Sequence, residues 1–141
     1  MSIEKFGSAQ WQGSVKQGKG SVSTESGALS DQPYGFNTRF EGVAGSNPEE
    51  LIGAAHASCF SMALSLMLGE AGFEPERIDT RATVSLDADS LTVTRVHLVT
   101  AARVPGCDQA AFDEAAQGAK ANCPISKLFT AEITLDATLE G

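Results

Sequence analysis

Two cysteines stand where their thiols could do redox chemistry. Cys59 lies in the middle of a long apolar segment, and Cys123 directly precedes Pro124, at a break in the chain. A helical turn that begins at Cys123 would point free N–H groups at its sulfur, and such N-termini lower the pKa of a thiol. A lone buried cysteine is usually inert, and burial reduces the few per cent of thiolate that a free thiol has at pH 7. The position of Cys59 therefore favours chemistry only if a cation lies beside its sulfur.

Arg39 is the cation that best meets this need. The chain has ten Lys and Arg residues, and Arg39 is the one inside an apolar-flanked segment. An arginine within ~4–6 Å lowers the pKa of a neighbouring acid by roughly 1–3 units. A buried arginine in turn needs a carboxylate partner, and Glu49 and Glu50 are the candidates.

His56 precedes Cys59 by about one helical turn and leaves other interpretations open. It could be the base of a cysteine hydrolase that has no need of Cys123. It could also be a metal ligand together with the two thiols, although their spacing is a weak zinc signal. A packed, hydrogen-bonded core histidine is the simpler interpretation, and a wall of a substrate pocket is the next. A redox-sensing or ligand-binding protein without turnover is the remaining alternative.

A long helix over residues 47–69 must position these groups. Asn47 is a good N-cap, and Gly69 or Gly72 can end the helix with a left-handed residue. After two glutamates in its first turn the segment carries no charge, and a helix without a polar face is predicted to be buried. The glutamates, His56 and several serines make it a poor membrane span.

The rest of the chain predicts an α+β fold in a single domain over residues 1–141. Its order of strands, helix, hairpin, helix and strand favours antiparallel β-sheets wrapped around buried central helices. The predicted elements are a hairpin within residues 8–26, a loop over 27–35, a strand over 36–41, a hairpin of strands 78–86 and 91–104, a helix over 108–122, a short turn over 125–129 and a final strand over 133–139.

Composition narrows the possible partners. The formal net charge of −8 argues against nucleic acid and against an anionic membrane surface. The N-terminal residues lack the basic flank and the following apolar run of a signal peptide, so none is predicted. Three widely separated cysteines do not form a secreted disulfide scaffold. We therefore expect a soluble cytoplasmic protein.

Three stretches resemble the OsmC (osmotically inducible protein C) family: QPYGFNTRF at residues 32–40, NPEELIGAAHASCFSMA at 47–63 and CPIS at 123–126. The resemblance covers essentially the whole chain and is closer to OsmC proper than to the sister group of organic hydroperoxide resistance (Ohr) proteins. It implies an OsmC/Ohr-like fold in an intertwined homodimer. It also implies a peroxiredoxin-like peroxidase of oxidative and osmotic stress defence, which reduces organic and, less well, inorganic hydroperoxides to alcohols or water.

The resemblance also implies the roles of individual residues. Cys59 would attack the peroxide, Cys123 would be its disulfide partner, and Arg39 with Glu49 would hold the thiolate. No bound cofactor or metal is implied, but an external dithiol must reduce the disulfide, and a lipoyl-type or other small dithiol is suggested.

Two further expectations concern the shape of this site. Apolar side chains around Cys59 should favour alkyl hydroperoxides over hydrogen peroxide, and the predicted pocket residues are Ile52, His56, Phe60, Met62 and Leu66. Glu49 and Cys59 are ten residues apart on one predicted helix, about 15 Å along its axis, and the Glu49 side chain leans toward the N-terminus. Because one arginine can hardly contact both, we predict that Glu49 and Cys59 of one site come from different chains of the dimer.

Overall fold

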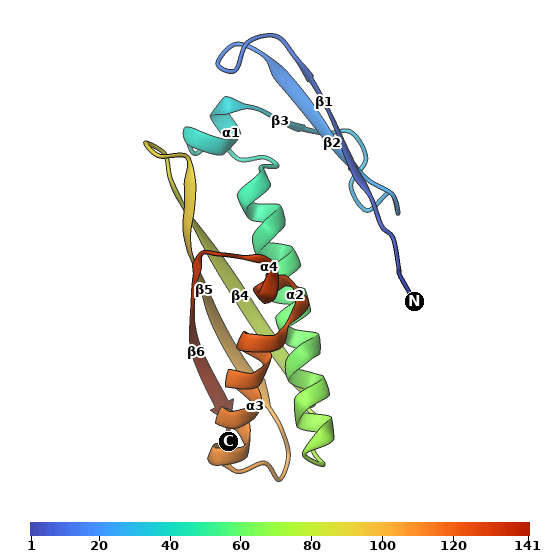
Figure 1. The fold of residues 1–141 in the computed structure, drawn as a ribbon, viewed down its shortest axis with the longest axis vertical. Helices are drawn as coiled ribbons and strands as arrows, with labels where there is room; N and C mark the ends of the chain where they lie inside the picture. Colours follow the sequence, from blue (N-terminus) through green and yellow to red (C-terminus); the bar gives the residue numbers. More distant parts are fainter. The chain divides into compact units, whose positions relative to one another are not determined.

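The computed structural model describes all 141 residues. The chain divides into two compact units, Met1–Leu51 and Ile52–Gly141. Its elements are β1 (Gly7–Gln12), β2 (Lys19–Thr24), β3 (Gln32–Tyr34), α1 (Phe36–Phe40), α2 (Pro48–Glu70), β4 (Arg77–Asp87), β5 (Thr92–Arg103), α3 (Gln109–Asn122), α4 (Pro124–Leu128) and β6 (Glu132–Glu140) (Figure 1). Two small sheets with helices make an α+β fold, as predicted.

The N-terminal unit is built on a three-stranded antiparallel sheet in the order β1-β2-β3. The predicted hairpin is present as β1 and β2. Residues 32–34, which were expected to lie in a loop, form the short strand β3, because Pro33 needs no ladder hydrogen bond at a sheet edge. Gly35 is the only buried residue of the first 45, so this sheet has no hydrophobic core of its own.

The predicted strand over residues 36–41 is wrong, because this segment forms the short helix α1. The amide of Arg39 donates to the Gly35 carbonyl over 3.2 Å, and the Thr38 hydroxyl bonds back to the Gly35 backbone. Phe36 and Phe40 stack with ring centroids 4.9 Å apart. Apolar residues at i and i+4 fit one helical turn as well as one strand face, which is why the alternation misled.

The ends of α2 agree with the caps that the sequence predicts. The Asn47 side chain accepts a hydrogen bond from the Glu50 amide over 2.9 Å. At the other end Gly72 is left-handed, with φ of 92°, while the amides of Gly72 and Phe73 donate to carbonyls of the last helical turn. This is a Schellman motif, which satisfies carbonyls that the helix end would leave unpaired.

The C-terminal unit places α2 and α3 on the same face of the sheet β4-β5-β6 (Figure 1). The β4–β5 hairpin is antiparallel, as predicted, but β6 pairs with β5 in parallel. The reason is that α3 and α4 carry the chain across the sheet before β6 begins, and such crossovers give parallel neighbours. The core residues of this unit are Phe60, Leu64, Leu68, Leu98, Ala102, Val104, Phe112, Ala115, Ala116 and Ala119.

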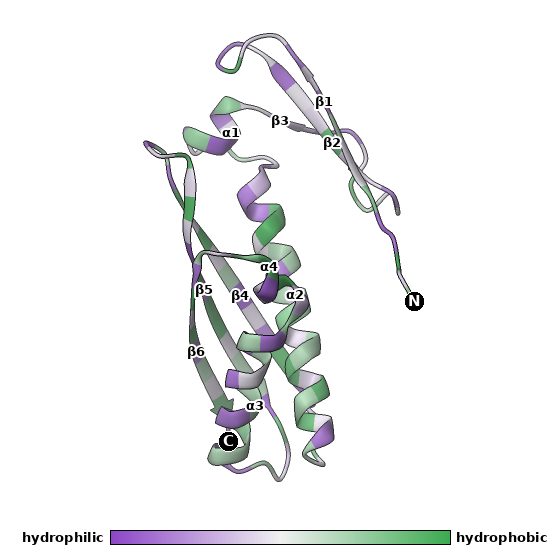
Figure 2. Cartoon of the chain, in the orientation of Figure 1, coloured by the Kyte–Doolittle hydropathy of each residue, from purple (hydrophilic) through white to green (hydrophobic).

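The prediction that α2 is buried all round needs correction. Phe60, Leu64 and Leu68 face the core, whereas Met62 and Leu66 on the opposite face are 76% and 62% exposed. Figure 2 shows that α2 is apolar or weakly polar along most of its length after the first turn. Length and composition alone would allow α2 to cross a membrane, but one of its faces packs in a protein core.

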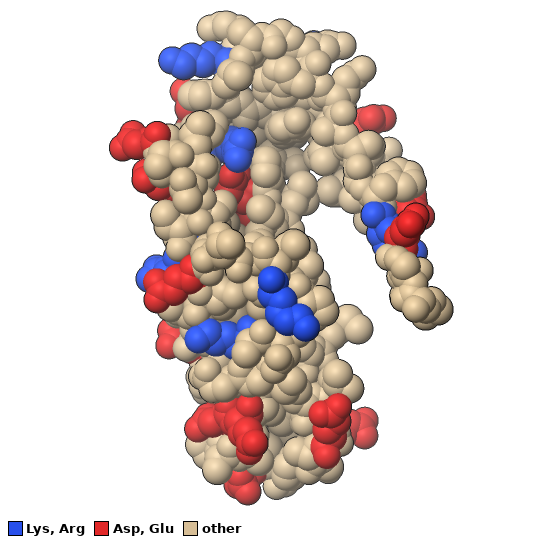
Figure 3. Space-filling model, in the orientation of Figure 1, with Lys and Arg blue, Asp and Glu red and all other residues tan.

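The negative charge is unevenly placed. Figure 3 shows acidic side chains gathered at the end of the C-terminal unit where α2 ends and α3 begins. The exposed acidic residues of these segments are Glu70, Glu74, Glu76, Asp108, Asp113 and Glu114. Asp108 also caps α3, because its side chain accepts a hydrogen bond from the Ala111 amide over 2.7 Å.

Candidate active site

The Cys59 and Cys123 thiols, predicted to work together, lie side by side in the structure. Cys59 is half-buried on α2, and Cys123 is fully buried at the junction where α3 ends and α4 begins. Cys123 lies close enough to act on the Cys59 thiol, and the backbone of Ile125 also acts on it. Both thiols are free. Both are therefore available to form a disulfide.

The surroundings of Cys59 in this chain oppose its ionisation. Burial raises the pKa of the Cys59 thiol above its ordinary value, and the neighbouring Cys123 raises it further. Only the hydrogen bond from Ile125 acts in the other direction. A thiol of this kind is mostly protonated at neutral pH, so it needs a further positive partner before it becomes a good nucleophile.

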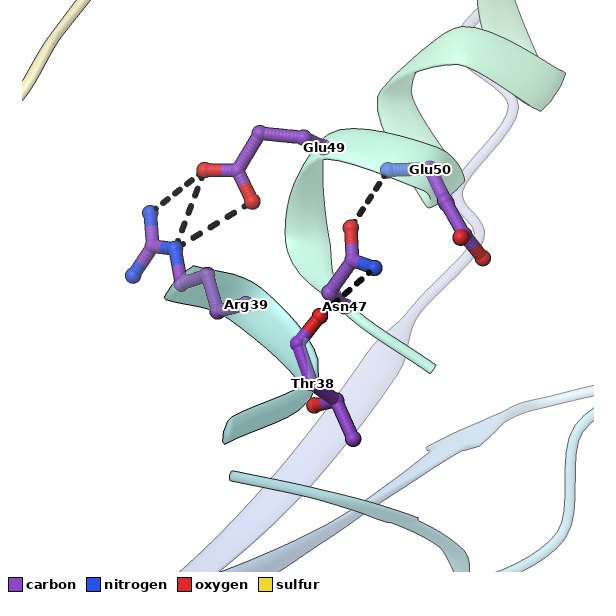
Figure 4. Close-up of polar contacts among 5 residues, drawn as sticks. All are labelled: Thr38, Arg39, Asn47, Glu49 and Glu50. Carbon is purple, nitrogen blue, oxygen red and sulfur yellow. Dashed lines mark hydrogen bonds and ion pairs between the residues drawn. The ribbon is translucent and has the colours of Figure 1, made fainter. Parts of the chain in front are cut away.

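Arg39 and Glu49 form an ion pair within the N-terminal unit (Figure 4). Nη2 of Arg39 lies 2.8 Å from Oε1 of Glu49, and Nε lies 3.0 and 3.2 Å from the two carboxylate oxygens. Glu49 comes from the first turn of α2 and Arg39 from α1. The Asn47 side-chain amide donates to the Thr38 carbonyl, which ties the two helix ends together. The pair holds the guanidinium in one orientation, with part of its surface still exposed.

An apolar cavity adjoins the Arg39 side chain in the same unit. It has a volume of about 270 Å³ and is lined by Trp11, Val15, Tyr34, Gly35, Phe36, Arg39 and Phe40. The Trp11 and Tyr34 rings lie 5.5 Å apart between centroids. Gly20 makes this approach possible, because a Cβ there would lie 2.6 Å from Trp11 and 2.7 Å from Tyr34. The sequence analysis did not identify this cavity, and the strand pairing that creates it has no local signal except Gly20.

His56 is a buried, hydrogen-bonded residue of the core. Its Nε2 lies 2.7 Å from the Ser126 hydroxyl, and its ring meets Phe129 edge-on at 5.2 Å. Burial lowers the pKa of His56, so the ring is neutral at physiological pH. Its Nδ1 has no hydrogen-bond partner. His56 is therefore not bonded to Cys59, and the Cys59–His56 arrangement of a hydrolase is not formed.

The other predicted pocket residues are spread over both faces of α2. Phe60 is fully buried, as is His56, so neither has surface with which to contact a substrate unless its surroundings move. Ile52 is half-buried, and Met62 and Leu66 are exposed.

The remaining chemical candidates lie apart from the two thiols. Cys107 is half-buried in the turn before α3, where burial and the adjacent Asp108 carboxylate raise the pKa of its thiol. His97, on β5, bonds to Thr134 and Asp136 of β6. No three His, Cys, Asp or Glu side chains are grouped as ligands for a metal ion.

Known proteins share both the sequence and the fold of this chain. A family model described as "OsmC-like protein" matches residues 41–138. The chain is 61% identical to the proteins named Peroxiredoxin OsmC from Escherichia coli (strain K12) and Shigella flexneri. Each alignment has 143 positions and covers the full length of both sequences.

Solved structures give the same picture at lower identity. An OsmC-like protein from Mycoplasma pneumoniae superposes with a TM-score of 0.75 over the whole of both chains at 13% identity. The organic hydroperoxide resistance protein OhrB of Bacillus subtilis superposes with a TM-score of 0.64 at 22% identity, over 96% of this chain and 98% of that one. These structural similarities show a shared fold.

Proposed function

The chain belongs to the family of OsmC-like proteins and is a peroxidase, and we propose that it reduces hydroperoxides through a Cys59 sulfenic acid and a Cys59–Cys123 disulfide. The observation that carries this proposal is the closeness of the two free thiols, since Cys123 acts directly on the pKa of Cys59. A disulfide requires two thiols that are neighbours in the fold, and these two meet that requirement.

The proposed reaction balances without a bound cofactor. The Cys59 thiolate attacks the distal oxygen of the hydroperoxide, the O–O bond breaks, and the alkoxide leaves as an alcohol after it takes up a proton. Cys59 is then a sulfenic acid. The Cys123 sulfur attacks it, water leaves, and the disulfide forms. An external dithiol returns both residues to thiols by two exchange steps; we propose a small dithiol of lipoyl type, acting in the cytoplasm.

Arg39 and Glu49 are the proposed activators of Cys59. A guanidinium beside the sulfur would favour the thiolate and polarise the peroxide, and the Glu49 carboxylate fixes its orientation. Glu49 and Cys59 are ten residues apart on α2, so about 15 Å of helix axis separates them. We therefore propose that the Arg39–Glu49 pair of one chain serves Cys59 of a second chain.

Two features support a homodimer. The exposed apolar face of α2 includes Met62 and Leu66, and large apolar side chains of this kind are typical of an interface. The N-terminal sheet buries no side chain of its own strands, and a small sheet without a covered face is not stable alone. A second copy of the chain would supply the missing cover.

The cavity beside Arg39 supports a preference for organic hydroperoxides. Aromatic side chains form most of its lining, and its volume of about 270 Å³ is near the lower end of the range for small-molecule pockets. An alkyl or aryl group there would lose its contact with water, whereas hydrogen peroxide would gain nothing from such a wall.

A single-turnover experiment tests the proposal. Reduced protein is mixed with one equivalent of cumene hydroperoxide, free thiols are trapped, and the products are mapped by mass spectrometry. We expect a Cys59–Cys123 disulfide with Cys107 still free. If Cys59 stays reduced while the peroxide persists, the proposal is wrong.

Substitution separates the roles of the two thiols. Cys123→Ser should still complete one turnover but should lose multiple turnover, because the Cys59 sulfenic acid has no partner and is oxidised further to the sulfinic acid. Cys107→Ser is the matched control and should turn over at the wild-type rate. Full multiple turnover by Cys123→Ser would rule out Cys123 as the disulfide partner.

A further inference from the structure

His56 has no part in the proposed reaction, although it is one of the few polar residues that are fully buried. Its Nδ1 has no hydrogen-bond partner, and its Nε2 is committed to Ser126. A buried polar ring with half of its capacity unused is costly to the fold. A hydrophobic residue would pack at this position without that cost, so the ring needs another explanation.

The contact between His56 and Ser126 joins the same two segments of the chain as the contact between the two thiols. His56 and Cys59 are three residues apart on α2, so they lie on the same side of the helix. Ser126 follows Cys123 by three residues in the α4 region and is adjacent to Ile125. The same two segments are therefore joined twice, once by His56 and Ser126 and once by the groups around the Cys59 sulfur.

Helix α4 depends on such contacts for its position. It has only five residues, and its N-cap has no side-chain hydrogen bond. A single helical turn does not hold its own geometry in water. The His56–Ser126 bond is the only side-chain hydrogen bond between α4 and another element. The edge-on contact with Phe129, at the end of α4, adds to it.

We propose that His56 is a positioning residue that holds α4 against α2 through Ser126, so that Cys123 and the Ile125 amide both face the Cys59 sulfur. This inference rests on the proposed function of the two thiols. It assigns the His56–Ser126 bond a role in the second step, in which Cys123 attacks the oxidised Cys59. The first step, attack on the peroxide, depends on it less.

Rapid-mixing kinetics of Ser126→Ala test this role. The variant loses the partner of His56 and keeps both thiols. We expect disulfide formation after a pulse of cumene hydroperoxide to be at least tenfold slower, and excess peroxide to convert part of Cys59 to the sulfinic acid. Mass spectrometry measures that product, which forms when the Cys59 sulfenic acid meets peroxide before it meets Cys123.

Two comparisons keep the result specific. Thr134→Val breaks the other histidine–hydroxyl bond of the chain, at His97, and should leave the rate of disulfide formation within twofold of wild type. His56→Gln, whose amide can reach Ser126 in place of Nε2, should retain more of the rate than His56→Leu. The comparison of His56→Gln with His56→Leu also tests the inference if Ser126→Ala does not fold.

A thiol oxidant separates this inference from the proposed function. Diamide takes two electrons from a pair of adjacent thiols and leaves as the hydrazine, so it closes the disulfide without any peroxide. A slow reaction of Ser126→Ala with diamide would support the positioning role even if the wild-type protein failed to reduce hydroperoxides. Closure at the wild-type rate with both oxidants would overturn it.

Discussion

Removal of the Arg39 guanidinium should slow peroxide reduction and move its pH dependence upward. In the single chain, burial and Cys123 both raise the pKa of Cys59, so Arg39 is the proposed source of the thiolate. An arginine at ~4–6 Å lowers an acid's pKa by roughly 1–3 units. Below the pKa each unit is tenfold in thiolate, so Arg39→Gln should react about ten- to a thousandfold more slowly at pH 7.

The direction of this pKa change can be tested through the pH dependence of the reaction rate. Because only the thiolate reacts, the rate rises with pH and levels off above the pKa of Cys59. Arg39→Gln raises that pKa, so its plateau should begin at a higher pH, and the gap to wild type should narrow as pH increases. Stopped-flow single turnovers with cumene hydroperoxide across the pH range measure both curves.

Arg77→Gln is the matched control, because Arg77 also forms an ion pair, with Asp79 on the exposed surface of β4. It should leave the pH–rate profile unchanged. A loss in Arg39→Gln that is the same at every pH would refute the reasoning about the thiolate and would place Arg39 on the peroxide alone.

Two other substitutions test the packing. Gly53→Ala should lower the melting temperature by a few degrees, because its Cβ would lie 2.9 Å from the Ala82 carbonyl oxygen. The cost of this overpacking (~1–3 kcal/mol) outweighs the gain in helix propensity of ~1 kcal/mol. The control Gly69→Ala, whose Cβ would have nothing within 4 Å, should raise the melting temperature. Met62→Glu should dissociate the proposed homodimer in analytical ultracentrifugation, whereas Leu91→Glu, at a site also exposed (68%), should not. A Gly53→Ala protein as stable as wild type, or a dimeric Met62→Glu, would contradict these expectations.

Local signals predicted the two long helices well. The ends of α2 depend on Asn47 and Gly72, whose side-chain or backbone preferences act within a few residues. Asp108 marks the start of α3 for the same reason. The strand predicted at residues 36–41 was wrong because the choice between strand and helix there depends on a turn at Gly35 that the apolar alternation does not report.

Long-range contacts were beyond such signals. The direction of β6 depends on how the chain crosses the sheet. The aromatic cavity needs Trp11 of β1 and Tyr34 of β3 to meet over Gly20 of the central strand β2. The roles of Cys59 and Cys123 came from the family resemblance, since nothing local relates a cysteine in α2 to one at the start of α4. In the fold the two thiols are close enough for Cys123 to raise the pKa of Cys59, but their roles in the reaction stay predictions.

The environment of Cys59 connects the predictions for Arg39→Gln and Met62→Glu. Within one chain, one backbone amide favours its thiolate, while burial and a neighbouring thiol oppose it. If Arg39 reaches Cys59 only from a second copy, a monomeric Met62→Glu protein has every catalytic residue and still lacks the activated thiol. It should then react with peroxide at about the rate of Arg39→Gln, and the double variant should be no slower than either. Independent, multiplying losses would instead mean that Arg39 activates Cys59 within its own chain.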